Sequence, residues 1–386
     1  MSTAAVFQIG SLGDSVLSLP ALLSLRDLLP DCSEYFIVNR FDNAMKVIPA
    51  QVFDMAWPAK GRLGYRGRGN LWKQTSTITS LLLSLRRLRP RYAVSLMPGG
   101  REDRQVARDR AFFQAAGILK FVGFRALTPD EFGPKECPGV TYSEAYLRFR
   151  RLWGEDSEQK FQQYARLPLI GIGAHAGDTA RKFLLRSRRF PERQLVALCP
   201  FSNCQSRDWS EQNIHQLLRK LEQTERVEVI LLGGQKDKDA GHRAIRAAGA
   251  GINACGMFTL EQSAAVLTQC QMAIAVESGP MHLAAALDVP TVVVFSRITP
   301  HFYRWLPLGS RHTILYRDVA CAGCRKLRCP FPNHPCMDDI TSDHVFEVVM
   351  RRLQGHAVAS VPGPGPRLLQ LERRQNAARP WLRADA

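Results

Sequence analysis

The sequence has no run of about 18 consecutive apolar residues, which is the length that a membrane-spanning helix needs. Its N-terminus also lacks the basic region and the small-residue cleavage site of a secretory signal peptide. These absences argue against an integral membrane protein and against an exported one. We therefore expect the protein in the cytoplasm.

Acidic residues are in deficit, with 35 Asp and Glu against 52 Lys and Arg, and the formal net charge is +17. Such a charge attracts an acidic partner, and nucleic acid, anionic lipid and a phosphorylated glycan would all satisfy it. The basic residues are dispersed, however, and no recognised nucleic-acid module is present. Nucleic acid is the weakest of the three candidates, and we expect no nucleic-acid partner.

A disulfide framework is not expected either, because ten cysteines in a 386-residue chain without a signal peptide are typical of reduced thiols. Four of them cluster as Cys321-x2-Cys324-x4-Cys329-x6-Cys336. Thiolates at this spacing could bind a structural zinc or iron ion, although the second pair is wider than in a standard zinc ribbon. The alternative is a set of free or locally packed thiols.

The chain does contain a repeated alternation of strand and helix patterns, over a length sufficient for two domains. The pattern starts near Ala4 and starts again at Leu195. Strands are expected at 4–9, 35–38, 92–96, 195–199, 227–232, 272–276 and 291–295, and helices at 15–29, 81–88, 212–221, 240–248, 260–267 and 281–287. This order predicts the α/β class, with two Rossmann-like doubly wound domains that face a central cleft.

Four segments follow from this pattern. Residues 1–170 form the first expected domain, and residues 195–354 form the second. Between them, 171–194 is rich in Gly, Arg and Ser and is predicted to be a linker. Residues 355–386 form a Pro-, Gly- and Arg-rich tail that we expect to be disordered.

The strongest functional signal begins at Val276, where an apolar run leads into Glu277, the pair Ser278-Gly279 and a helix of small residues. The free N–H groups and the positive dipole end of such a helix favour an anion, and Gly279 lets the anion approach the main chain closely. A phosphate is the expected ligand. His282 lies one turn into the same helix.

Five motifs occur in order between Val6 and about Leu353. They are Gly13-Asp14 followed by Pro20, Ser202-x4-Arg207-x-Trp209, Leu231-Leu232-Gly233-Gly234, Ser278-Gly279-Pro280-x-His282, and the cysteine cluster with Cys336-Met337-x2-Ile340. Together they resemble glycosyltransferase family 9, the family of lipopolysaccharide heptosyltransferases. The resemblance implies GT-B architecture and inverting transfer without a catalytic metal. It also implies an acceptor-binding N-terminal domain and a C-terminal domain that binds a nucleotide sugar, usually ADP-heptose.

The resemblance also assigns roles to single residues. Asp14 resembles the catalytic base, with Ser11 and Gly13 in its loop next to the acceptor. The donor-binding positions implied by the resemblance are Ser202, Asn203, Arg207, Phe258, Glu277, Ser278, Gly279 and His282. Among them, Arg207 would neutralise the pyrophosphate, and Phe258 could pack on the adenine.

Each role has a structural alternative. Asp14 could simply cap the following helix, and Arg207 could be a solvated surface residue. Ser202 and Asn203 could be turn residues, and Phe258 a core residue. His282 could likewise be a structural histidine, and Trp209 is better interpreted as core than as ligand.

Three positions depart from the family pattern. Glu277 stands where the family usually has Asp, and its extra methylene moves the carboxylate. Gln8 replaces a basic residue found in many members, and Ser296-Arg297-Ile298-Thr299-Pro300 replaces Gly-Pro-Thr-x-Pro. These departures suggest either an unusual donor or acceptor or a weakened activity.

Two functions of different class remain at this point. The first is an inverting glycosyltransferase that moves a heptose or related sugar from an ADP-sugar to a lipopolysaccharide core or another anionic glycan. It would work in the cytoplasm, with peripheral contact to the inner membrane. The second is a non-enzymatic binding or assembly protein with a metal at the cysteine cluster.

Overall fold

The computed structural model describes residues 2–39, 71–133, 142–299, 301–356 and 366–371. These residues divide into two compact units. Unit 1 contains the described residues up to Leu169 together with Tyr303–Trp305. Unit 2 contains Ile170–Phe302 and most of the described residues from Leu306 onward. A short segment from late in the sequence therefore belongs to the unit that the N-terminal half forms.

Within the described residues, unit 1 is built on a parallel four-stranded sheet in the order β2-β1-β3-β4. Its strands are β1 Ser2–Phe7, β2 Cys32–Val38, β3 Tyr92–Ser95 and β4 Lys120–Val122. The central strand β1 is buried from Ala4 to Phe7. A strand that is covered on both faces reads as a continuous apolar run, which is why the sequence pattern located it.

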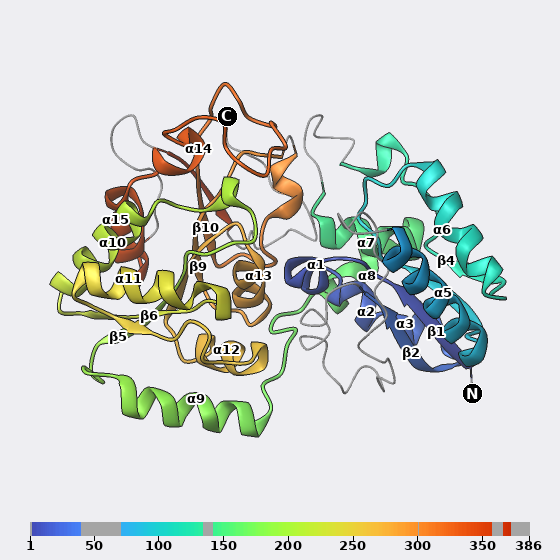
Figure 1. The fold of residues 1–386 in the computed structure, drawn as a ribbon, viewed down its shortest axis with the longest axis horizontal. Coiled ribbons are helices and arrows are strands. Elements are labelled where there is room, and N and C mark those ends of the chain that lie inside the picture. The colour runs from blue at the N-terminus through green and yellow to red at the C-terminus, as the bar shows by residue number, and fades with distance from the viewer. Residues whose placement is uncertain (1, 40–70, 134–141, 300, 357–365, 372–386) are drawn as a thin grey trace. The chain divides into compact units, whose positions relative to one another are not determined.

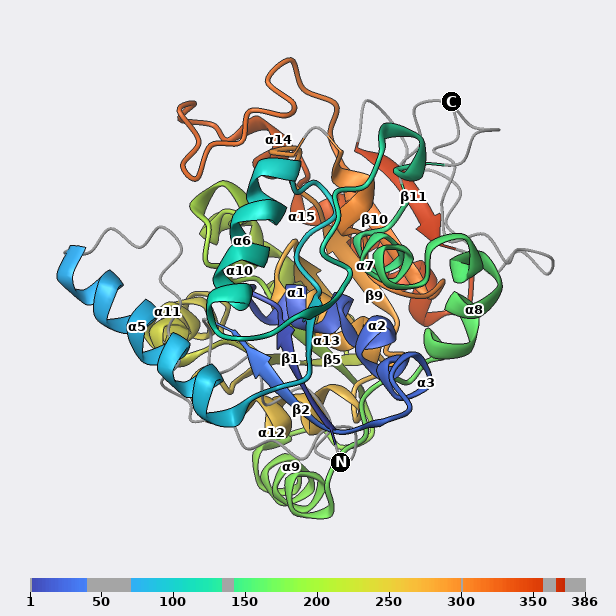
Figure 2. The same cartoon turned by 90° about the vertical axis from the view of Figure 1, so that its right-hand side faces the viewer.

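Helices cover both faces of this sheet. They are α1 Leu12–Leu17, α2 Leu19–Leu23, α3 Leu25–Leu28, α5 Leu71–Leu88, α6 Asp103–Ala115, α7 Glu144–Trp153 and α8 Ser157–Tyr164, with short 3₁₀ turns at Pro129–Glu131 and Gly154–Asp156. Leu81 and Leu85 of α5 and Phe113 of α6 share a buried cluster with Phe7 of β1. Helices α2, α7 and α8 contact one another, and Figure 2 shows them on the other side of β1 from α5.

The single helix predicted at 15–29 is wrong, because three short helices, α1 to α3, occupy this stretch. The hydroxyl of Ser18 donates to the carbonyl of Asp14, and the hydroxyl of Ser24 donates to the carbonyl of Ala21. Side-chain bonds of this kind compete with the helical ladder, and Pro20 has no N–H to offer it. The first helix also starts earlier than predicted, at Leu12, so Asp14 lies inside its first turn.

Unit 2 is built on a seven-stranded sheet in the order β11-β10-β9-β8-β5-β6-β7, as far as the structure describes the chain. The strands are β5 Gln194–Cys199, β6 Val227–Leu231, β7 Ile252–Asn253, β8 Met272–Val276, β9 Thr291–Val294, β10 His312–Tyr316 and β11 Arg367–Leu371. All pairs are parallel except that of β10 with β11. Figure 2 shows β11 beside β10.

Two helical layers cover the sheet of unit 2 (Figure 1). One contains α10 Glu211–Gln223, α11 Lys238–Ala248 and α15 Ser342–Leu353, and the other contains α9 Ala174–Ser187, α12 Leu260–Leu267 and α13 Gly279–Ala286. The shorter elements are α14 Pro335–Asp338 and the 3₁₀ turns Gln205–Arg207 and Gln235–Asp237. A further 3₁₀ turn, Phe302–Trp305, begins in unit 2 at Phe302 and continues in unit 1. None of the helices in the described ranges is long and apolar enough to cross a bilayer.

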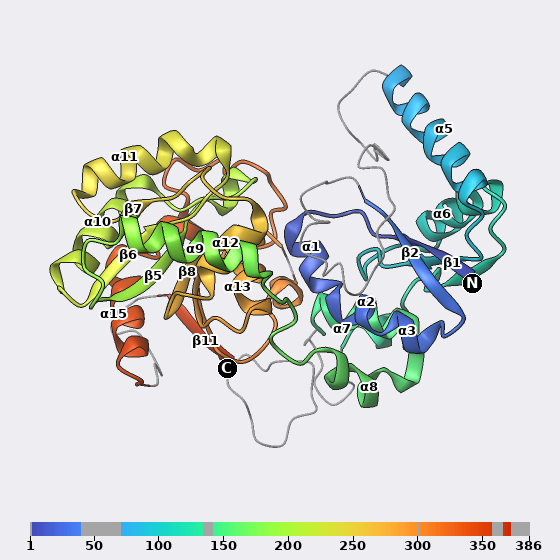
Figure 3. The same ribbon diagram turned by 90° about the horizontal axis from the view of Figure 1, so that it is seen from below.

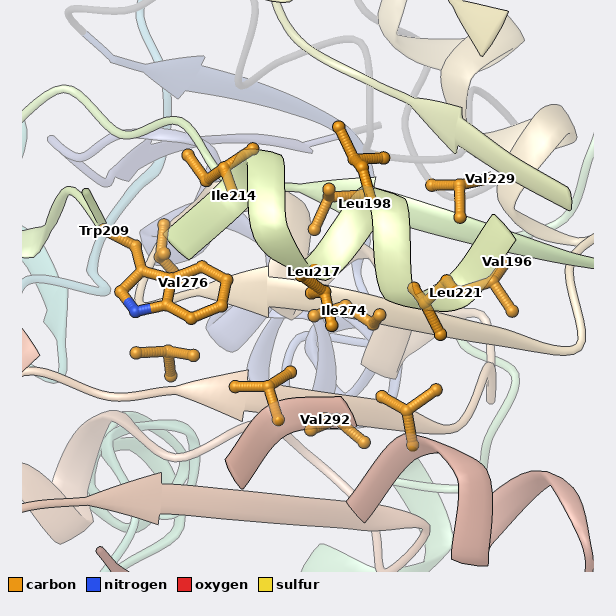
Figure 4. Close-up of a cluster of buried hydrophobic side chains, with 14 of the residues drawn as sticks. Val196, Leu198, Trp209, Ile214, Leu217, Leu221, Val229, Ile274, Val276 and Val292 are labelled. Carbon is orange, nitrogen blue, oxygen red and sulfur yellow. The ribbon is translucent and has the colours of Figure 1, made fainter. Parts of the chain in front are cut away.

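The core of unit 2 lies between the sheet and the α10 layer. Leu217 and Leu221 of α10 pack against Val196 of β5 and Ile274 of β8 in one buried cluster (Figure 4). Trp209 closes the end of this cluster, with 4% of its surface exposed. The prediction that Trp209 is a core residue is therefore confirmed.

Two segments differ from the sequence-based expectation. The stretch 171–194 contains helix α9 in place of a linker, because Ala176, Ala180 and Leu184 recur every four residues and are buried. This helix runs along α12 (Figure 3). Within the tail expected to be disordered, Arg367–Leu371 forms strand β11, whereas 357–365 and 372–386 lie outside the described residues.

Candidate functional site

Asp14 lies in the first turn of α1, just after the loop that follows β1. Its carboxylate folds back onto that loop, where Oδ2 accepts hydrogen bonds from the backbone N–H of Ser11 (3.0 Å) and from the Ser11 hydroxyl (3.2 Å). Gly10 makes this possible, since a Cβ at that position would lie 2.2 Å from the Cβ of Asp14. The Asp14 side chain stays 20% exposed, so the carboxylate is held in place and still reaches solvent.

Arg148 of α7 holds the other oxygen of this carboxylate. Its Nη2 donates to Oδ1 of Asp14 at 2.8 Å, and its Nη1 donates to the Asp14 carbonyl at 2.8 Å and to the Ser18 hydroxyl at 2.6 Å. The Arg148 side chain is only 1% exposed. A buried guanidinium with a rigid fork of donors fixes its partner more firmly than a flexible ammonium would.

Glu144, one turn before Arg148 on the same helix, extends the arrangement. Its Oε1 accepts hydrogen bonds from Arg148 Nε (3.2 Å) and from the backbone N–H of Gly99 (2.7 Å). Its Oε2 accepts from Nη2 of Arg304 at 2.6 Å. The result is a line of alternating charge, Asp14, Arg148, Glu144 and Arg304, in which both middle residues are fully buried.

The turn that follows β3 is fastened to the same helix. Arg151 donates to the carbonyls of Met97, Pro98 and Gly99, the last two at 3.0 Å. Burial lowers the pKa of Arg151 to about 10, which leaves it charged at neutral pH. Neither Arg151 nor Glu144, which both bind this turn from α7, was among the site residues predicted from the sequence.

In unit 2, the predicted phosphate turn has the expected form. Ser278 precedes α13 in extended conformation, directly after β8, and its side chain makes no capping bond. The buried Ser278 hydroxyl has no hydrogen-bond partner within the described residues. Gly279 and Pro280 begin the helix, and His282 is buried one turn further on. This arrangement leaves the helix N-terminus and a hydroxyl able to serve an anionic ligand.

Glu277 and Arg207 form an ion pair beside this turn, with 3.3 Å between Oε1 and Nη2. Burial raises the pKa of Glu277, although Arg207 and the Ser296 hydroxyl that donates to Oε2 act in the opposite direction. The Arg207 side chain is 32% exposed, whereas that of Glu277 is 3% exposed. Glu277 and Ser296, both departures from the family pattern, thus contact each other.

The turn after β5 holds the remaining donor candidates. Ser202 uses its hydroxyl within the turn, where it donates to Oδ1 of Asp208 at 2.7 Å, while Asn203 is exposed. Lys236, which the sequence analysis did not identify, donates to the Ser202 carbonyl at 2.6 Å from the turn after β6. Because β6, β5 and β8 are neighbours in the sheet, the turns that follow them lie along one edge.

Phe258 lies in the loop before α12 and packs edge-to-face on Phe183 of α9, with 4.9 Å between ring centroids. The four cysteines Cys321, Cys324, Cys329 and Cys336 line a single pocket that His334 also borders. Burial raises the pKa of Cys336 to about 11. Among the described residues, however, no group of three or more His, Cys, Asp or Glu side chains is arranged to hold a metal ion.

Comparison with known families gives a match over residues 159–334, to the family described as glycosyltransferase family 9 (heptosyltransferase). The chain is 31% identical over 96 residues to lipooligosaccharide heptosyltransferase 2 of Campylobacter jejuni, covering 25% of this chain and 30% of that protein. It is 28% identical over 162 residues to lipopolysaccharide heptosyltransferase 2 of Salmonella typhimurium, covering 40% and 46%. The chain thus matches less than half the length of these relatives.

Solved structures resemble about nine tenths of the chain. ADP-heptose lipopolysaccharide heptosyltransferase II of E. coli has a TM-score of 0.63 at 18% identity, covering 92% of this chain and 100% of that one. A family 9 glycosyltransferase from Veillonella parvula has 0.67 at 16%, covering 92% and 98%. The E. coli heptosyltransferase WaaC with ADP-2-deoxy-2-fluoro heptose has 0.56 at 15%, covering 91% and 99%. These likenesses confirm the predicted α/β fold of GT-B architecture.

Proposed function

We propose that the chain, whose residues 159–334 match glycosyltransferase family 9, transfers a heptose, or a related sugar, from an ADP-sugar to a lipopolysaccharide core or related glycan. The relatives named above are heptosyltransferases, and one of the similar structures contains an ADP-heptose analogue. Two features of unit 2 together carry the proposal: a Ser278 hydroxyl that has no hydrogen-bond partner among the described residues and lies at a helix N-terminus, and an Arg207 side chain that is 32% exposed.

The donor half of the reaction is assigned to unit 2. As the bond between the sugar and the diphosphate breaks, the departing ADP takes the electron pair and its charge grows. N–H groups at the start of α13 and the guanidinium of Arg207 are suited to neutralise that charge. Lys236, at the turn after β6, can add a second cation. These groups supply positive charge without a metal, so we propose that transfer proceeds in the presence of EDTA.

The acceptor half is assigned to unit 1. Asp14 would remove the proton from the acceptor hydroxyl as its oxygen attacks the anomeric carbon from the face opposite the ADP. The configuration at that carbon is then inverted, and the proton remains on Asp14 until solvent takes it. The partial exposure of the Asp14 carboxylate suits this role, because a base must reach the hydroxyl that it deprotonates.

The acceptor is expected to be anionic, since the chain carries a net charge of +17. We propose that the protein works in the cytoplasm, in peripheral contact with the inner face of the membrane that carries the growing glycolipid. Binding to vesicles with and without anionic lipid, at low and high salt, tests this part of the proposal.

The decisive experiment is a transfer assay. Purified protein is incubated with a lipopolysaccharide core acceptor and with ADP-heptose, GDP-mannose or UDP-glucose, and both ADP release and the mass of the glycan are measured. We expect transfer from ADP-heptose alone, and thermal stabilisation by the same donor. Lack of transfer from every donor would overturn the proposal.

A second candidate is favoured by the pocket that four cysteines share. In this alternative the protein is a binding or assembly factor with a structural zinc or iron ion at Cys321, Cys324, Cys329 and Cys336. It predicts one equivalent of metal by elemental analysis and no sugar transfer. Transfer without bound metal would eliminate it.

A further inference from the structure

We propose that Glu144 is a positioning residue for Asp14, acting through Arg148, and that Arg304 completes this arrangement from the second half of the sequence. The proposal rests on the function proposed above, because it gives Glu144 a role in the step that Asp14 performs. Within the described residues, the hydrogen bonds of Glu144 and Arg304 reach Asp14 only through Arg148, along the line that ends at its carboxylate.

The first step of the argument is the orientation of Arg148. Its Nε bond to Glu144 sets the plane of the guanidinium, and the two Nη groups then meet the Asp14 carbonyl, the Ser18 hydroxyl and Asp14 Oδ1. If the Nε partner were lost, the guanidinium could rotate, and Asp14 Oδ1 would lose its fixed donor. A displacement of about 1 Å in a reacting group can reduce turnover a hundredfold.

The second step is charge balance. Arg148 is 1% exposed and Glu144 is completely buried, so each needs the other to offset the loss of hydration. If an uncharged side chain at position 144 still accepted the Nε bond, Arg148 would keep its orientation but would have only Asp14 as counter-ion among the described residues, and it would bind that carboxylate more strongly. Such a tight ion pair would make the carboxylate a poorer base. Glu144 therefore divides the attraction of Arg148 between two carboxylates.

Helix capping does not account for Glu144. The N-cap of α7 is Ser143, whose hydroxyl already accepts the N–H of Tyr146. All three donors to Glu144 come from elsewhere: Gly99 in the turn after β3, Arg148 one turn along, and Arg304 from a segment 160 residues away in sequence. The Glu144 carboxylate therefore connects α7 to the turn after β3 and to the segment of Arg304, and it does not cap the N-terminus of α7.

The turn after β3 is shaped for Arg304. A Cβ on Gly99 would lie 3.1 Å from Arg304 Nη2, and a Cβ on Gly100 would lie 3.4 Å from Nη1. Both glycines therefore leave space that the guanidinium uses. Phe302, two residues before Arg304, packs on Phe295 and Tyr316 in unit 2, although Arg304 itself belongs to unit 1. The candidate base thus depends on a residue whose near neighbour in sequence is anchored in the other unit.

The test is a set of variants assayed for transfer. Glu144→Gln keeps the size of the side chain but removes its negative charge. It also replaces one oxygen, which accepts a hydrogen bond from an arginine, by an amide N–H₂ group. We expect kcat to fall about tenfold or more while KM for the donor changes less than about twofold, because donor binding belongs to unit 2. The matched control is Glu131→Gln, which removes a carboxylate paired with Arg125 and Arg150 in the same unit but without contact to Asp14.

Two further measurements separate positioning from a merely structural role. In an Asp14→Asn background, Glu144→Gln should cause little further loss of kcat, since a residue that acts through Asp14 has nothing left to position. Arg304→Lys should retain more activity than Arg304→Met. The Arg304 variants also serve if Glu144→Gln fails to fold, because the Arg304 side chain is 13% exposed whereas that of Glu144 is fully buried.

The outcomes are distinct. If the wild-type protein transfers sugar and both Glu144→Gln and Arg304→Met are as active as Glu131→Gln, the positioning role is wrong and the proposed function stands. If Glu144→Gln costs the same factor with and without Asp14, its role is structural and the proposal fails. If the wild-type protein transfers no sugar, the proposed function is wrong, and the positioning role, which depends on it, is wrong as well.

Discussion

Each of the two units contains an Asp or Glu paired with an arginine near the carboxyl ends of its strands. In unit 1 the arginine is the buried member of the pair, and in unit 2 the acid is. In unit 1 the Asp14 side chain is 20% exposed and Arg148 is 1% exposed. In unit 2 the Glu277 side chain is 3% exposed and Arg207 is 32% exposed. The more exposed member of the pair is therefore the anion in unit 1 and the cation in unit 2. An exposed carboxylate suits proton removal, and an exposed guanidinium suits a diphosphate.

The largest expected effect is a loss of turnover when the Asp14 carboxylate of unit 1 is removed. Asp14→Asn can keep the Ser11 hydrogen bonds through its amide oxygen, but it loses the bond from Arg148 and removes the base. Turnover should therefore fall by at least about a hundredfold with donor affinity nearly unchanged. Steady-state kinetics and calorimetry with ADP measure the two quantities. Asp31→Asn, at a surface ion pair with Arg91, is the control. Near-normal turnover in Asp14→Asn would exclude Asp14 as the base.

The next largest effect is a loss of ADP affinity when the Arg207 guanidinium of unit 2 is removed. Arg207→Ala should weaken binding of ADP itself, as well as of the intact donor, by about tenfold or more, because a charge-assisted contact to phosphate is lost. Calorimetric titration with ADP measures this, and Arg243→Ala, at an exposed pair with Glu211, is the control. An unchanged ADP affinity would mean that the exposed guanidinium of Arg207 is not part of the donor site.

A smaller effect concerns the cysteine segment, which contacts the turn that carries Arg207. The N–H of Ser206 donates to the Leu327 carbonyl at 3.2 Å, and the ring of His334 contacts the Ser206 carbonyl. We expect Cys321→Ser combined with Cys324→Ser to lower the melting temperature by about 5 °C, with a smaller loss in the activity of the molecules that stay folded. Elemental analysis decides whether a metal takes part. A stable double variant without turnover would contradict this structural assignment.

The smallest effect is a pH dependence of unit 2. His312 is fully buried between the Thr291 hydroxyl and the Leu308 carbonyl, and burial lowers its pKa to about 4. The unfolded chain then binds more protons than the folded one below the usual histidine pKa of about 6.5. Stability is therefore complete above that value and declines as the pH falls from there toward 4, by about 1 kcal/mol at pH 5.5.

Thermal unfolding of wild type and His312→Gln at several pH values measures this decline. The variant should be less stable at neutral pH but should lose less stability between neutral pH and pH 5.5. Equal slopes for the two proteins would mean that another group titrates in this range.

The sequence was most informative where structure is local. The strands and helices that were predicted in unit 2 lie within two residues of their observed bounds, and α12 and β8 were predicted at those bounds. The strands β7, β10 and β11 and the helices α14 and α15 were not predicted. The glycosyltransferase resemblance depended on turns such as Ser278-Gly279, in which the chemistry and the backbone conformation lie within a few residues. Helix α9 was missed because its buried stripe is narrow, and its Gly and Arg residues resemble a linker.

What the sequence determined by itself is the alternation of buried strands and helices, the phosphate-type turn before α13 and the acid at Asp14, since each depends on residues that are close in the chain. Tertiary structure alone decided what surrounds them. Arg148 lies 134 residues from Asp14, and Arg304 lies 160 residues from Glu144. Which of two paired side chains is buried also depends on the packing around both. The sequence does not show whether a charged residue on a helix faces solvent or a buried partner. For Arg148, only the packing of α7 against the loop of Asp14 shows that it is buried and paired.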